Sequence, residues 1–259
     1  MTIDIDPVIV HLGPLALGWY GVFVALAIGV GMWLAFREAR RRGLPMEQME
    51  SLATWVFVGG VVGARALHVI DRWDLYAPNP LGIFAIWNGG LAIMGAVLGG
   101  TLTGLVVAWR RGLPVRAISD AAAPAVILSQ AIGRFACLFT GDAVGRPTSG
   151  FGITYLNPHA MVHQIGVAYE PVFLYEMAWD LAVFAVLWLL RPVLRVDGHL
   201  FAVYLALYAL GKFALSFLRT ETVWLAGLQE AQLLAIGALG LAVLWAVVSR
   251  RRATLAAAA

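Results

Sequence analysis

Four basic residues lie within or at the end of apolar stretches: Arg65, Arg134, Lys212 and Arg219. A cation inside a bilayer costs about 2–3 kcal/mol or more unless it meets a partner or water. Arg65 and Arg134 each precede the end of an apolar run by five residues, about 7.5 Å at ~1.5 Å per residue. Lys212 precedes Arg219 by seven residues, so the two share nearly one helix face. Because Arg65, Arg134 and Arg219 are predicted at one level, we expect a cationic cavity for an anion with apolar tails, rather than separate snorkelling arginines.

Other polar side chains fall in the same layer. Glu176 lies about one turn inside its apolar run, with Asp180 four residues later, and the pairing of Glu176 with an arginine would suit a polar cavity. Tyr20 enters the first run, where an aromatic belt at the headgroups is the simpler interpretation. His159 and His163 have no carboxylate spaced to join them, so no metal site is predicted.

The composition assigns these residues to a membrane protein. The 259 residues are 61% hydrophobic and 13% charged, whereas an ordinary soluble domain carries about 25% charged residues. A helix needs about 20 mostly apolar residues to cross a bilayer. We therefore predict an all-α integral membrane protein, one domain over 1–259, with seven transmembrane helices near Leu15–Phe36, Ser51–Ile70, Leu81–Ala108, Ala117–Phe139, Pro171–Leu190, Leu200–Leu218 and Ala226–Val248.

The basic clusters predict the orientation of the spans. Twelve of the 18 Lys and Arg residues follow the first, third, fifth and seventh spans. The positive-inside rule then places the N-terminus outside, the C-terminus in the cytoplasm and the loop at about 140–170 outside. The first span lacks a charged n-region and an A-x-A-like cleavage site, so we expect it to stay in the membrane. Basic residues scattered in this way do not form a nucleic-acid surface, so no nucleic acid is expected as a partner.

Glycine pairs four residues apart predict close helix packing. They are Gly59 with Gly63, Gly95 with Gly99, and Gly100 with Gly104. Small residues at this spacing let two helix backbones approach each other. We assign them to packing and not to chemistry.

A series of short motifs, in one order along nearly the whole chain, resembles the prolipoprotein diacylglyceryl transferase family of bacterial inner membranes. No single motif decides the resemblance; the ordered series carries it. The motifs are Gly18-Trp19-Tyr20-Gly21, Gly63-Ala64-Arg65, Ile86-Trp87-Asn88-Gly89-Gly90-Leu91, Asp120-x-x-x-Pro124, Gln130-Ala131-Ile132-Gly133-Arg134, Leu174-Tyr175-Glu176, Phe217-Leu218-Arg219 and Ala231-Gln232-Leu233.

The resemblance implies transfer of the diacylglyceryl group of phosphatidylglycerol to the lipobox cysteine in a prolipoprotein signal peptide, with release of glycerol phosphate. It implies membrane lipids as the surroundings, a multi-pass location in the bacterial inner membrane, and no cofactor. The family's phosphate-binding arginines match Arg134 and Arg219, and its first-span tyrosine matches Tyr20. We take Asp142 as a further catalytic candidate. The remaining substrate-binding candidates are Arg65, Asn88, Gly89, Gly90, Gly145 and Glu176.

The chain departs from the family pattern where protons are handled. Cys137, Thr140 and Asp142 replace two asparagines and a glutamate of the signature, and Met94 stands where many members carry a histidine. The candidates for the proton acceptor are then Asp142, His68 and Tyr20. Cys137 is expected to be a small buried hydrophobic residue.

Two other classes of function stay open. One is a paralogue that binds or moves phospholipid, or modifies another acceptor, without prolipoprotein transfer. The other is a transporter, which fits less well because the polar residues gather near one leaflet and not at the midplane.

Overall fold

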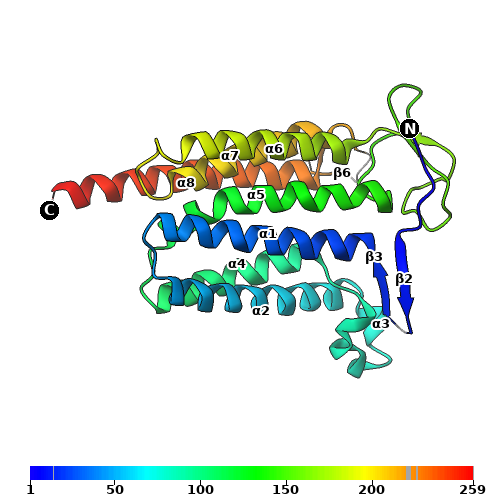
Figure 1. Ribbon diagram of the computed structural model, residues 1–259, viewed down its shortest axis with the longest axis horizontal. Helices are drawn as coiled ribbons and strands as arrows, with labels where there is room; N and C mark the ends of the chain where they lie inside the picture. The colour runs from blue at the N-terminus through cyan, green and yellow to red at the C-terminus, as the bar shows by residue number, and fades with distance from the viewer. Residues whose placement is uncertain (14, 220–222, 226, 259) are drawn as a thin grey trace. The chain divides into compact units, whose positions relative to one another are not determined.

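The computed structural model describes residues 1–13, 15–219, 223–225 and 227–258 (Figure 1). Within that part of the chain, seven helices are long and apolar enough to cross a membrane, which confirms the predicted fold class. Which end of each helix faces the cytoplasm stays a prediction. The seven are α1 (Trp19–Arg41), α2 (Met46–Asp71), α4 (Ile93–Arg110), α5 (Val115–Thr140), α6 (Val172–Leu190), α7 (His199–Ser216) and α8 (Glu230–Ala258).

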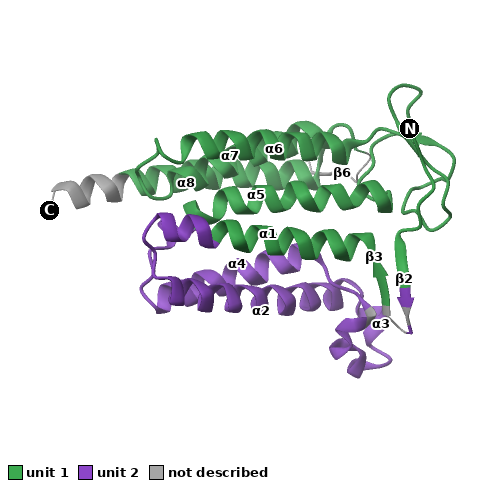
Figure 2. Ribbon diagram, viewed as in Figure 1, with its two compact units in different colours: residues 1–10, 16–35, 119–259 green, residues 11–15, 36–118 purple. Residues whose placement is uncertain are grey.

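The chain divides into two compact units, coloured separately in Figure 2. Unit 1 comprises residues 1–10, 16–35 and 119–259, and unit 2 comprises residues 11–15 and 36–118. The expectation of a single domain stays a prediction.

Unit 2 is built on the close packing of α2 against α4. A Cβ at Gly63 would collide with the carbonyl oxygen of Gly95, and a Cβ at Gly99 with that of Gly59. A Cβ at Gly100 would lie 3.2 Å from the carbonyl oxygen of Val56. The predicted packing role of the glycine pairs is confirmed, since only the absence of side chains allows this approach.

The prediction that the third span begins at Leu81 is wrong. The helix begins at Ile93, after α3 (Trp73–Tyr76) and two short 3-10 helices, η1 (Pro80–Phe84) and η2 (Ile86–Asn88). Trp87 and Asn88 therefore do not open the third span. Hydropathy could not reveal this, because the segment is apolar; Gly89 and Gly90, with φ of +82° and +76°, interrupt the helix.

Unit 1 contains the core of α5, α6 and α7. Each helix contributes a fully buried residue to one hydrophobic cluster: Ile127 from α5, Leu187 from α6 and Leu200 from α7. The Ser129 hydroxyl of α5 donates to the Ala27 carbonyl of α1 at 2.8 Å. At the start of α7 the Asp120 carboxylate accepts the backbone N–H of Gly198 at 2.9 Å and of Phe201 at 2.8 Å. A carboxylate in this position satisfies free donors and complements the helix dipole.

The long loop between α5 and α6 is packed and partly extended. A three-stranded sheet joins β1 (Thr2–Ile3), β4 (Ile153–Tyr155) and β5 (Ala168–Tyr169), with β1 parallel and β5 antiparallel to β4. The Tyr155 hydroxyl donates to the carbonyl of Leu138 at 3.2 Å. Burial raises the pKa of this phenol, so it stays a donor. The remaining strands are β2 (Val8–Leu12), β3 (Leu15–Gly18), β6 (Val223–Leu225) and β7 (Leu228–Gln229).

Candidate functional site

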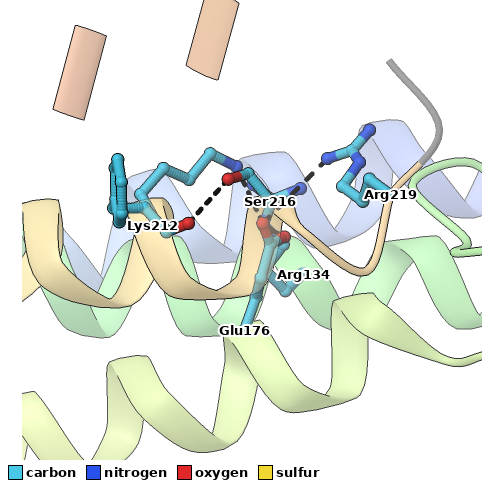
Figure 3. A network of polar contacts seen from close by, with 6 residues as sticks. Arg134, Glu176, Lys212, Ser216 and Arg219 are labelled. Atoms are coloured by element: carbon cyan, nitrogen blue, oxygen red, sulfur yellow. Dashed lines mark hydrogen bonds and ion pairs between the residues drawn. The ribbon is translucent and has the colours of Figure 1, made fainter. Parts of the chain in front are cut away.

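Glu176 of α6 is surrounded by three cations in unit 1 (Figure 3). Lys212 Nζ of α7 donates to its Oε1 at 2.7 Å. Arg134 Nε of α5 lies 2.8 Å from Oε2, and Arg219 Nη1, beyond α7, lies 4.0 Å from Oε1. The Glu176 side chain is buried, with the residue 5% exposed. One carboxylate cannot neutralise three cations, so this cluster retains excess positive charge.

The helix period explains how Glu176 reaches this position. The buried residues of α6 recur every three or four positions and form one stripe, Val172, Phe173, Glu176, Asp180, Val183 and Leu187. The stripe faces the core, so its two carboxylates must enter the interior with its apolar members. Gly211 of α7 permits close contact there, since a Cβ would collide with the Trp179 indole.

Arg134 keeps hydrogen-bonding capacity that its ion pair does not use. Apart from the ion pair of its Nε with Glu176 Oε2 and a contact with the Cys137 thiol, its guanidinium makes no hydrogen bond to a described residue. The side chain is 27% exposed. A guanidinium with free N–H groups in a partly buried place suits the oxygens of a phosphate, which accept two parallel hydrogen bonds.

A small pocket adjoins the cluster and adds residues that the sequence analysis did not assign to the site. Asp180 and Tyr208 line it together with Arg134, Glu176 and Lys212; its other lining residues are Trp179, Gly211 and Leu215. The signal was present in the sequence. Asp180 follows Glu176 by four residues and Tyr208 precedes Lys212 by four, so each shares a helix face with a charged neighbour.

Two of the predicted catalytic residues lie near Arg134. Tyr20, at the second position of α1, is 40% exposed and interacts electrostatically with Asp142, Cys137 and Arg134. The Asp142 carboxylate accepts the hydroxyl of Thr140. The structure thus brings Tyr20, Asp142 and Arg134 into one neighbourhood, while their catalytic roles stay predictions.

Gly145 has a packing role at the same end of unit 1. A Cβ there would lie 2.6 Å from Val172 Cγ2 and 2.8 Å from the carbonyl oxygen of Leu218, the residue before Arg219. Its N–H donates to the carbonyl of Glu170 at 2.8 Å. A side chain at Gly145 would therefore disturb the turn that carries Arg219.

The guanidinium of Arg65, in unit 2, is hydrogen-bonded to main-chain carbonyls. Its Nε, Nη1 and Nη2 atoms donate to five carbonyl oxygens, at 2.7 to 3.4 Å. The acceptors are Gly82, Ile83, Ala85, Gly89 and Gly90. A guanidinium has five N–H donors, so these contacts use all of them. The structure gives Arg65 the role of holding the segment 82–90, and its binding of substrate stays a prediction.

The other predicted residues of this segment are placed by their backbone. Gly90 needs to be glycine, since a Cβ would lie 2.6 Å from His68 Nε2 and 2.7 Å from Arg65 Nη1. Gly89 also has positive φ. Asn88 belongs to η2, and its side chain lies outside the described part of the structure. The binding roles of all three stay predictions.

The fold and the site define a multi-pass helical membrane protein with a buried cationic cluster. Residues 7–248 match the sequence model of the family described as "Prolipoprotein diacylglyceryl transferase", and the chain belongs to this family. The resemblance inferred from the motifs is confirmed.

Relatives named "Phosphatidylglycerol--prolipoprotein diacylglyceryl transferase" match over nearly their whole length. The protein of Nostoc sp. PCC 7120 is 40% identical over 258 residues, which covers 95% of this chain and 90% of the relative. The protein of Geobacillus kaustophilus is 40% identical over 250 residues, covering 94% and 92%. That of Bacillus cereus ATCC 14579 is 36% identical over 252 residues, covering 96% and 93%.

Proposed function

We propose that this protein transfers the diacylglyceryl group of phosphatidylglycerol to the lipobox cysteine of prolipoproteins, as a multi-pass enzyme of the bacterial inner membrane. The main supporting observation is that Arg134 belongs to a cluster of excess positive charge and, apart from its ion pair with Glu176 and a contact with the Cys137 thiol, makes no hydrogen bond to a described residue. Relatives named for this activity match the chain over nearly its full length. This favours the transferase over a phospholipid-binding paralogue.

The reaction is a displacement at carbon. The cysteine sulfur attacks the glycerol carbon that carries the phosphate ester, and a C–S bond forms while the C–O bond breaks. The electron pair goes to the phosphate oxygen, so the phosphodiester monoanion leaves as glycerol phosphate with a second negative charge. Arg134 and Arg219 stabilise the charge that grows on the phosphate, and Lys212 adds to the positive field.

The thiol must lose its proton during the reaction. A free thiol has a pKa near 8.5, and a cationic cavity lowers it, so a strong base is not needed. Met94 cannot accept a proton, which leaves Asp142, Tyr20 and His68 from the sequence. Asp142 and Tyr20 belong to the neighbourhood of Arg134, whereas His68 contacts the Arg65 segment.

Purified protein incubated with phosphatidylglycerol and a lipobox peptide tests the function. The expected product is a thioether diacylglyceryl adduct on the peptide, detected by mass spectrometry. Arg134→Gln and Arg219→Gln should abolish most of the transfer, and the double variant should lose less than the sum of the single losses. Arg72→Gln is the matched control, because Arg72 is exposed and pairs with Asp74 at 3.8 Å. Folded wild-type protein that binds the lipid but leaves the peptide unmodified would identify a paralogue.

We propose the orientation that the basic clusters predict, with the N-terminus and the 140–170 loop outside and the C-terminus in the cytoplasm. In a Cys137→Ala background, Gly150→Cys should react with an impermeant maleimide added to intact cells. Gly150 suits this probe because it is exposed. Arg41→Cys should react only after the cells are opened. If only the Arg41→Cys protein were labelled in intact cells, the orientation would be the reverse of the one proposed.

A further inference from the structure

Asp180 is a buried residue of α6 with an ionisable carboxyl group. The residue is 5% exposed, and it makes no hydrogen bond or ion pair with a described residue. It lies one turn from Glu176 on α6 and lines the pocket with Arg134, Lys212 and Tyr208. Buried polar groups in proteins almost always have partners, because desolvation without compensation is costly. A carboxyl group kept without one, in a pocket that adjoins three cations, needs an explanation.

The charges around the pocket give that explanation. Arg134, Lys212 and Arg219 carry three positive charges, and Glu176 and Asp180 carry two negative charges when both are ionised. The site alone then has one excess positive charge, which one phosphodiester monoanion neutralises. When the diester becomes a phosphomonoester dianion, the balance fails by one negative charge. Protonation of one carboxylate restores it.

The charged and titratable groups that act on Asp180 come from all three helices around it. They are Arg134 of α5, Glu176 of its own helix, and Lys212, Tyr208 and Tyr204 of α7. Glu176 is already ion-paired with Lys212 and Arg134, at 2.7 and 2.8 Å. Asp142, the other carboxylate near Arg134, already accepts the Thr140 hydroxyl. Asp180 is therefore the group best placed to take up one proton.

We propose that Asp180 is the final acceptor of the thiol proton, which keeps the buried site neutral as the phosphate changes from monoanion to dianion. The inference rests on the proposed function and deepens it. The sulfur lone pair forms the C–S bond, the C–O pair leaves with the phosphate, and the thiol proton ends on a carboxylate oxygen of Asp180. Asp180 need not touch the sulfur, since the Tyr208 hydroxyl or water in the same pocket can relay the proton.

Binding of glycerol 1-phosphate, without peptide, tests the charge balance directly. Between pH 7.5 and 9.5, about where the phosphomonoester is a full dianion, wild-type protein should take up about one proton per ligand bound. Calorimetry in two buffers of different ionisation enthalpy measures this number. Because binding takes up a proton, the dissociation constant should increase by up to about tenfold for each unit of rising pH. Short-chain phosphatidylglycerol, a monoanion, should bind without proton uptake.

Asp180→Asn should bind glycerol 1-phosphate with no proton uptake and no pH dependence over this range. Asp180→Glu should restore the uptake, and Asp74→Asn, which changes an exposed carboxylate, should behave as the wild type. Absence of uptake in wild-type protein, or its persistence in folded Asp180→Asn, overturns the proposal. These binding results are independent of peptide modification, so they separate this inference from the proposed transferase activity.

The kinetics of peptide modification give a second test, in which Asp180→Asn should change kcat but not KM. Asp180→Asn should lower kcat by about 100-fold or more, the usual contribution of a positioned proton acceptor. The KM for phosphatidylglycerol should stay within a few-fold, because removal of a negative charge does not weaken anion binding. Asp180→Glu should recover most of kcat. A folded Asp180→Asn protein with wild-type kcat, by initial rates of peptide modification, overturns the proposal even if binding is as expected.

Discussion

Arg65 of unit 2 and Arg134 of unit 1 have the same place in the sequence pattern and opposite surroundings. Each follows a small residue and lies five residues before the predicted end of its span. Arg65 donates to five main-chain carbonyls, whereas Arg134 donates to no main-chain carbonyl of a described residue and is held by its ion pair with Glu176 and a contact with the Cys137 thiol. Depth in a span therefore does not tell a binding arginine from a structural one. The donors that a guanidinium leaves free of main-chain carbonyls are a better guide, and they support the proposed binding role of Arg134.

The largest expected effect separates the two arginines by substitution with lysine. Arg134→Lys should lower kcat/KM for peptide modification by about 10- to 100-fold, because lysine cannot make the planar two-point contact with phosphate. Its melting temperature should stay near that of the wild type. Arg65→Lys should instead lower the stability, since three donors cannot serve five carbonyls and each orphaned buried group costs about 1–3 kcal/mol.

Thermal unfolding in detergent and initial rates on the same preparations check this pair. The structural role of Arg65 is wrong if Arg65→Lys unfolds as the wild type does and yet binds phosphatidylglycerol weakly. That result would make Arg65 a lipid ligand, as the sequence analysis predicted.

A smaller effect tests the glycine packing that holds unit 2 together. Gly63→Ala forces a methyl group against the carbonyl of Gly95 and should cost about 1–3 kcal/mol, as overpacked interiors do. Gly60→Ala is the matched control on the same helix, because its Cβ would lie at an ordinary 3.5 Å from the Ala96 carbonyl. Unfolding midpoints of the two variants measure the difference. Equal midpoints would show that α2 and α4 separate without cost.

Gly90→Ala tests how firmly the hydrogen bonds of Arg65 hold its side chain in place. The new Cβ would press on Arg65 Nη1 and His68 Nε2, and a positive φ costs an alanine about 1–2 kcal/mol. Gly166→Ala, at φ +83° with nothing within 4 Å, carries the strain alone. The excess destabilisation of Gly90→Ala over Gly166→Ala, read from unfolding midpoints, is the cost of displacing Arg65 and His68. No excess would mean that the five hydrogen bonds adapt freely.

The seven spans and the glycine contacts could be predicted, because both follow from local properties of the chain. Runs of about 20 apolar residues and glycines four apart have few alternative interpretations in a membrane. The start of α4 could not be predicted, since the segment 81–92 is as apolar as a span and only its backbone departs from a helix. The acceptors of Arg65 are main-chain carbonyls, which no pattern of side chains reveals.

The members of the cationic cluster could be predicted, but the ion pairs that they form could not. Lys212 and Arg219 were marked by seven-residue spacing, and Glu176 by its depth. Glu176 forms ion pairs with Arg134 and Lys212, whereas Asp180, one turn away, forms none with a described residue. This difference depends on how three helices pack. Such differences arise from tertiary geometry, and charge and spacing along the sequence do not determine them.

The smallest expected effect concerns Cys137, which looks reactive by residue type alone. It is 3% exposed and packs in a cluster with Ile153 and Phe173. Cys137→Ala should leave kcat/KM within about threefold and cost about 1 kcal/mol of stability, because it removes one buried atom from a well-packed place. Initial rates and unfolding midpoints measure both. Mass spectrometry of wild-type protein after turnover should find an unmodified thiol. A diacylglyceryl adduct on Cys137 would instead establish a two-step transfer through the enzyme and would show that residue type, in this case, outweighs surroundings.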